Sequence, residues 1–137
     1  MSPSGPARGP VGAYLAPIGI ALVHAATGVA GLYFGNLAGA VTLFWPPSGI
    51  AIAAGVIFGL PGILACAISN FVVNLATTGS LGFSLAACLA NTAEASLAST
   101  VFRRSAEGRV GLARPHDAGA LFVAGAIGAL VAALVGS

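Results

Sequence analysis

The sequence predicts an all-α integral membrane protein with about five transmembrane helices. Of its 137 residues, 58% are hydrophobic and only 6% are charged, whereas a soluble domain carries about a quarter charged residues. The mean hydropathy of +1.01 agrees with this class. The apolar residues also fall into runs of about 20, the length that a helix needs to cross the hydrocarbon core. The net charge of +2 is too small to suggest a nucleic-acid partner. The apolar composition makes the lipid bilayer the expected partner.

The chain starts with a Pro/Gly-rich tail over residues 1–10, which we expect to be disordered. The first apolar run covers residues 11–34, long enough to span a membrane, and contains Pro17 and His24. A cleaved signal peptide over residues 1–25 is the alternative, because small residues lie at plausible cleavage positions near its end. The single arginine of the tail and the continuation of the apolar run favour a transmembrane helix.

The second span, residues 38–58, is interrupted or opened by the most distinctive stretch of the chain, Phe44-Trp45-Pro46-Pro47-Ser48-Gly49-Ile50. The proline pair ends one helix and suits the first turn of the next, where a missing N–H donor costs nothing. Trp45 suits a membrane–water interface, Ser48 can accept a hydrogen bond from a free N–H group of the new helix, and Gly49 allows close helix approach. An ordinary helix start is one interpretation. The other is a ligand or sensing site formed by Trp45, Pro46, Pro47, Ser48 and Gly49.

After a tight turn predicted at residues 59–62, three further spans are expected over residues 62–78, 81–102 and 118–135. A polar loop over residues 103–116 lies between the last two. Four crossings separate Arg8 from the four arginines of the polar loop, so all five arginines fall on one side of the membrane. Cytoplasmic loops are rich in arginine. The pattern therefore predicts a cytoplasmic N-terminus and a cytoplasmic loop 103–116, with the Trp45–Gly49 stretch at the outer face.

A stripe of small residues is expected to pack against other helices of the same protein or of a partner membrane protein. Gly31, Gly35 and Gly39 recur at four-residue spacing, which places them on one helix face and lets another helix approach closely. For Gly35 and Gly39 a glycine-rich turn is an equal alternative.

Five polar residues within the spans are candidates for ligand binding or sensing: His24, Asn70, Asn74, Asn91 and Glu94. Helical rise places all five in one layer of the bundle. Glu94 is the only carboxylate within a span, and such a residue marks a functional site by default. Interhelical hydrogen bonding that only stabilises the bundle is the alternative for the three asparagines. His24 is either a pH-responsive partner of Glu94 or an ordinary satisfied polar residue.

Motifs of soluble enzymes are missing from the sequence. The glycine-rich runs lack the Gly-Lys-Ser/Thr end of a P-loop, and there is no H-E-x-x-H metal motif. Cys66 and Cys88 lie within apolar runs and form no C-x-x-C pair, which is typical of small buried hydrophobic residues. We therefore expect no enzymatic activity, no metal and no cofactor.

The pattern resembles the MASE1 (membrane-associated sensor 1) domain family of bacterial signalling proteins. The resemblance covers residues 11–135 and rests on these stretches: Phe44–Ala51, Phe58-Gly59, Pro61–Ile63, Asn74-Leu75, Asn91-Thr92-Ala93-Glu94-Ala95 and Arg103-Arg104. It implies an inner-membrane input module of about eight helices that controls a histidine kinase or a diguanylate cyclase/phosphodiesterase. With about five spans, this chain corresponds to a partial version of that bundle, without the output domain.

Three functions are consistent with these features. A sensory input domain would respond to an unknown small ligand, a lipid or a partner at the Trp45–Gly49 stretch or at the polar layer around Glu94. A small transporter is the second function, because transporters use broken helices and carboxylates within the membrane. A ligand-free scaffold that assembles through its small residues is the third.

Overall fold

The computed structural model describes residues 10–37 and 46–105, together with isolated positions between 119 and 130. The described residues form four helices and no strand: α1 (Pro10–Leu37), α2 (Pro46–Phe58), α3 (Leu60–Thr78) and α4 (Leu81–Ser105). The all-α class is thus confirmed for this part of the chain. Several predicted features lie outside it: the tail before Pro10, Gly39, Trp45, most of loop 103–116 and most of the span 118–135.

Three of the four helices are long and apolar enough to cross a membrane: Leu15–Phe34 within α1, all of α3, and Leu81–Arg104 within α4. They coincide with the first, third and fourth predicted spans. α2 is also apolar but has only 13 residues, or about 20 Å of helix, so its described part is too short to span. Two boundaries differ from the prediction, because Leu60 and Pro61 already belong to α3 and Arg103 and Arg104 still belong to α4.

Glycine and proline account for the breaks between these helices. Gly59 alone separates α2 from α3 and has a φ of 65°, a conformation that residues with a side chain rarely adopt. Pro61 follows in the first turn of α3, where its missing N–H donor is tolerated. Gly79, with a φ of 67°, ends α3, and its N–H donates to the carbonyl of Leu75. The Ser80 hydroxyl then accepts a hydrogen bond from the N–H of Phe83 at the start of α4.

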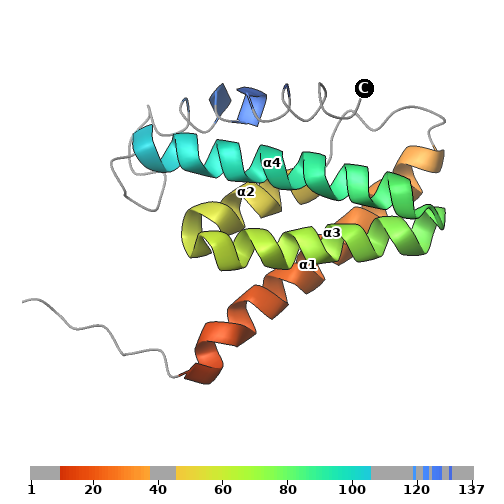
Figure 1. Ribbon diagram of the computed structural model, residues 1–137, viewed down its shortest axis with the longest axis horizontal. Coiled ribbons are helices and arrows are strands. Elements are labelled where there is room, and N and C mark those ends of the chain that lie inside the picture. Colours follow the sequence, from red (N-terminus) through yellow and green to blue (C-terminus); the bar gives the residue numbers. More distant parts are fainter. Residues whose placement is uncertain are drawn as a thin grey trace, which may run out of the picture.

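The four helices form one bundle, in which α3 and α4 lie side by side and antiparallel, α1 crosses them obliquely, and α2 lies behind α4 (Figure 1). α2 runs in the same direction as α4. Ser48, at the start of α2, meets Glu94, and Gly55, further along, meets Ser99. Gly59, directly after α2, meets Arg103 near the end of α4. Small residues of both helices belong to one buried cluster, including Ala51 of α2 and Ala95 and Ala98 of α4. The chains of α2 and α4 therefore approach closely over the whole length of α2.

Polar side chains lie inside this bundle and large apolar side chains lie on its surface. Among the described residues, seven polar or charged ones are buried: His24, Ser69, Asn70, Asn74, Ser84, Glu94 and Ser99. The exposed apolar residues include Leu22, Val29, Ile68, Val72 and Leu89. Large exposed apolar side chains around buried polar ones are unusual for a soluble protein, and together with the three apolar helices they suggest a membrane environment.

Candidate functional site

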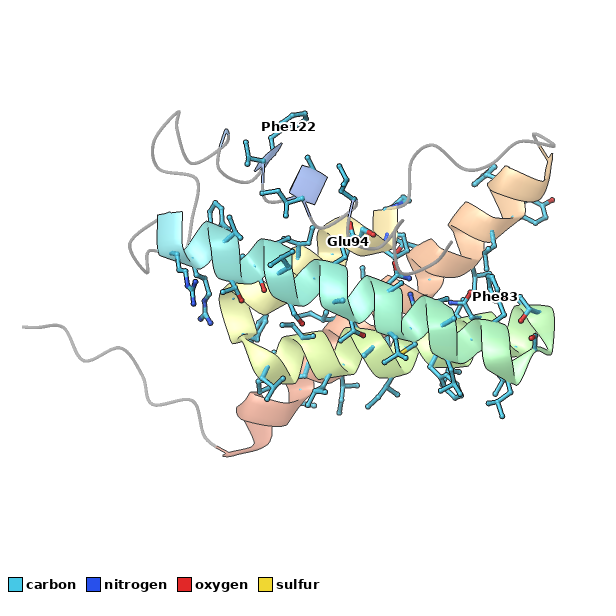
Figure 2. All side chains as sticks on the ribbon, turned by 45° about the horizontal axis from the view of Figure 1, so that its top comes forward. Phe83, Glu94 and Phe122 are labelled. Atoms are coloured by element: carbon cyan, nitrogen blue, oxygen red, sulfur yellow. The ribbon has the colours of Figure 1, made fainter. Side chains whose placement is uncertain are left out.

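A hydrogen bond joins the two most distinctive stretches of the sequence. The Ser48 hydroxyl, in the first turn of α2, donates to Oε2 of Glu94 over 3.1 Å. Glu94 is only 8% exposed, and its side chain extends from α4 toward the amino end of α2 (Figure 2). The free N–H groups and the dipole of a helix amino end favour a carboxylate there. The contact therefore holds the amino end of α2 against α4.

This contact changes two expectations for the Trp45–Gly49 stretch. Ser48 was expected to cap an N–H group of its own helix, but its hydroxyl binds the Glu94 carboxylate instead. The stretch was also expected at the outer mouth of the bundle. Glu94 lies near the middle of α4 (Leu81–Ser105), so Ser48 lies beside the middle of that helix and not at its end. The proposed outer site and the proposed Glu94 site are thus one site.

The neighbours of Ser48 have different surroundings. The Pro47 side chain is fully buried, and its Cγ lies 3.7 Å from where a Cβ on Gly28 of α1 would be. Pro47 thus packs α2 against α1. Pro46 is half-buried and Gly49 is exposed, while Trp45 lies outside the described residues.

Toward the carboxyl end of α2, two glycines that were not among the predicted packing residues allow close contact with neighbouring helices, Gly55 in α2 and Gly62 in α3. A Cβ on Gly55 would come within 2.7 Å of the Ser99 hydroxyl oxygen of α4. A Cβ on Gly62 of α3 would come within 2.5 Å of the Ala54 carbonyl oxygen of α2. Neither position has room for a side chain, so these glycines set the closeness of the three helices. In the predicted glycine stripe, Gly31 is buried and Gly35 is helical, whereas Gly39 lies outside the described residues.

A second polar contact joins α1 to α3. The Ser69 hydroxyl donates to the carbonyl oxygen of Ala21 over 3.0 Å, and it also lies 3.1 Å from Nδ1 of His24. The hypothesis that His24 pairs with Glu94 is therefore wrong for the described structure, in which the partner of His24 is Ser69. Ser69 was missed because only histidine, asparagine and glutamate side chains within the spans were selected from the sequence. The position of Ser69 next to Asn70, within an apolar run, could have indicated a buried polar contact.

The asparagines of α3 form a pair on one helix face, as their spacing predicted. Nδ2 of Asn74 donates to the side-chain oxygen of Asn70 over 2.8 Å and to its carbonyl oxygen over 2.9 Å. Asn70 also lines a small cavity together with His24 of α1 and Asn91 and Thr92 of α4. Three of the five residues predicted to share one layer thus meet at this cavity, and Asn74 is bonded to one of them. Glu94 does not line the cavity, because it faces α2.

The site contains few groups capable of chemistry. Within the described ranges 10–37 and 46–105, no group of three His, Cys, Asp or Glu side chains could hold a metal ion. Cys66 lines the cavity and Cys88 donates weakly to the carbonyl oxygen of Ala67, so both thiols pack as small apolar side chains. The chemistry that these side chains offer is hydrogen bonding between helices, as at Ser48–Glu94 and Ser69–Ala21.

Comparison with known proteins leaves the family open. No family model matches the chain, and neither the curated proteins nor the solved structures contain a match to it. The assignment to the membrane-associated sensor family therefore stays a prediction from the residues that carry the resemblance.

Proposed function

We propose that this chain is part of a membrane-embedded sensory input domain, in which a signal acts on the contact between Ser48 and Glu94. The observation that carries the proposal is that hydrogen bond of 3.1 Å. Ser48 and Glu94 belong to the two sequence stretches on which the resemblance to the MASE1 family most depends. The two residues are 46 positions apart in sequence and meet at a partly buried polar contact, which is the expected arrangement if both stretches serve one site.

The proposed environment is the bacterial inner membrane. Support comes from three helices of spanning length, from their exposed apolar surfaces and from the burial of the polar side chains. The proposal includes five spans, a cytoplasmic N-terminus and a cytoplasmic loop over residues 103–116. It also includes further helices and an output enzyme, a histidine kinase or a cyclic di-GMP enzyme, in the complete protein.

The contact suits a switch because it is polar, small and partly buried. A hydrogen bond of this kind contributes about 0.5–3 kcal/mol, which a ligand can offset by binding one helix arrangement more tightly than the other. Ala51 of α2 and Ala95 and Ala98 of α4 belong to one buried cluster, and their short side chains interdigitate little. Helix sliding at such a surface needs few rotamer changes.

A chimera tests the proposal. The chain is joined to the remaining helices and diguanylate cyclase of a MASE1 protein, and cyclic di-GMP is measured in cells. Ser48→Ala and Glu94→Leu are expected to change the output at equal protein levels, because the first removes the hydroxyl donor and the second removes the acceptor oxygens. Thr100→Val is the control, since the Thr100 hydroxyl bonds only to the Ser96 carbonyl of its own helix. Wild-type output from both site variants would reject the proposed role.

A small transporter is the second candidate, favoured by one observation. The described part of α2 begins beside the middle of α4 (Leu81–Ser105), as half-helices do in transporters, where the amino end faces an anionic group. Proteoliposomes with an enclosed pH dye distinguish the two functions. Proton flux that is lost in Glu94→Gln would favour transport over sensing.

A further inference from the structure

The cavity is lined by residues of all four helices, Ala51 of α2 among them, and its polar lining comes from α1, α3 and α4: His24, Asn70, Asn91 and Thr92. Two of these side chains are almost completely buried, with 4% of His24 and 3% of Asn70 exposed. Buried polar groups in proteins are satisfied by hydrogen bonds, either to protein or to ordered water. The donor and acceptor atoms of His24 and Asn70 that have no partner in the protein therefore determine which hydrogen bonds a ligand in the cavity must make.

The contacts of Ser69 determine the tautomer of His24. A carbonyl oxygen can only accept, so the single hydroxyl proton of Ser69 is donated to the Ala21 carbonyl oxygen, 3.0 Å away. The contact of 3.1 Å between His24 Nδ1 and Ser69 must then be an N–H that donates to the hydroxyl oxygen. In a neutral imidazole with a proton on Nδ1, Nε2 is a bare acceptor. Ser69 does not line the cavity and His24 does, so the ring edge away from Ser69 is the one left for the cavity.

The contacts of Asn70 determine which of its atoms is left. Its side-chain oxygen accepts the hydrogen bond of 2.8 Å from Nδ2 of Asn74. Its own Nδ2 has no hydrogen-bond acceptor among the residues that the structure describes. The cavity thus brings together one free acceptor, on α1, and one free donor, on α3.

We propose that this cavity is a binding site for one water molecule, which donates to Nε2 of His24 and accepts from Nδ2 of Asn70. The space accessible to the centre of a water molecule is about 10 Å³, which is at the limit for a single water. A ligand here must both donate and accept, and a single water does both. Asn91 and Thr92 offer further partners from α4, so the water joins three helices. A larger sensory ligand must then act elsewhere, at Ser48 and Glu94.

Solution NMR of the full chain in detergent micelles tests this site, with His116→Gln leaving His24 as the only imidazole. ¹⁵N shifts of the ring should show a protonated Nδ1 and a bare Nε2. A nuclear Overhauser contact should link a His24 ring proton to a water that exchanges slowly. Loss of this contact is expected in Asn70→Leu, which removes the donor but leaves the Ser69 bond and hence the tautomer. The Thr77→Val control keeps both signals, because the Thr77 hydroxyl bonds only within α3.

Three results would overturn the site: no contact with water in the His116→Gln protein, a proton on Nε2, or a water contact that persists unchanged in Asn70→Leu. The first two need no further substitution, so the test stands even if Asn70→Leu does not fold. Ala51 of α2 also lines the site, but the NMR test measures the water directly and needs no signalling output. Its failure is therefore distinguishable from that of the proposed function, which the chimera measures at Ser48 and Glu94.

Discussion

At the scale of residues, the chemistry of the chain depends on pairs whose members are distant in sequence. The sequence predicted Ser48 and Glu94 separately, because each is an unusual residue in its surroundings, but it did not predict that they bind each other. No local pattern encodes that pairing, since it depends on the packing of α2 against α4. His24 shows the same limit: its polarity within an apolar run was readable, whereas its partner Ser69 is 45 residues away.

Ser48→Ala is expected to lower the free energy of unfolding by about 1–3 kcal/mol, because Glu94 loses its hydroxyl donor within the bundle. In a double-mutant cycle, Ser48→Ala and Glu94→Leu should be non-additive by at least about 0.5 kcal/mol, since residues in contact share an interaction energy and leucine has no acceptor for the Ser48 hydroxyl. Unfolding by sodium dodecyl sulfate in mixed micelles, followed by circular dichroism, measures each variant.

The control cycle for this pair combines Ser48→Ala with Thr100→Val. Thr100 is exposed and bonds to the Ser96 carbonyl of its own helix over 2.6 Å, so the two changes should add. Additivity of Ser48→Ala and Glu94→Leu as well would mean that the hydrogen bond contributes nothing to folding.

At the scale of helices, apolar run length together with glycine and proline predicted the positions of α1, α3 and α4 to within a few residues. Such boundaries follow from local backbone preferences, which sequence shows directly. The close contacts between helices were not predictable in the same way. Gly31, Gly35 and Gly39 were selected by spacing. Close approaches between helices also occur at Gly55 and Gly62, which spacing did not indicate, because it says nothing about which helix face meets a neighbour.

Gly62→Ala is expected to destabilise the protein by about 1–3 kcal/mol, as is usual for overpacking. Its new Cβ would lie 2.5 Å from the Ala54 carbonyl oxygen, a backbone atom that cannot rotate away. Gly19→Ala is the matched control: a Cβ there meets nothing within 4 Å, and alanine is favoured over glycine within a helix by up to about 1 kcal/mol. Denaturation midpoints of the two variants should therefore shift in opposite directions. A shift in the same direction would contradict the packing of α2 on α3.

At the scale of the whole molecule, composition alone predicted the helical class and the apolar surface. The arrangement of the bundle could not be predicted, because lipid-exposed and buried helix faces are both rich in apolar residues here. The polar residues marked the interior correctly: His24, Asn70, Asn74 and Glu94 are all buried. Residues of this kind are costly toward lipid, which makes them better indicators of the inner faces than the apolar residues are.

Ile68→Lys is expected to reduce membrane insertion of α3. Ile68 lies in the middle of α3 and is 66% exposed, and a lysine at the centre of a membrane helix costs about 2.5–3.5 kcal/mol. Leu60→Lys is the control, because Leu60 is 65% exposed but is the first residue of α3, from which a lysine can reach the interface. Insertion into microsomes, scored with glycosylation tags on either side of α3, compares the two. Equal insertion of both variants would mean that this face of α3 does not meet lipid.

The junction at Gly59 has a mechanical consequence. Gly59 is the sole residue between α2 and α3, so the carboxyl end of α2 is fixed to α3, and any tilt of α2 relative to α3 would occur about Gly59. Over the roughly 20 Å length of a 13-residue helix, a tilt of about 10° would displace the far end by about 3 Å. That travel equals the whole length of the 3.1 Å bond between Ser48 and Glu94. A small rotation about Gly59 would thus suffice to break the bond at Ser48, and it would also move Pro47 along its contact with Gly28 of α1.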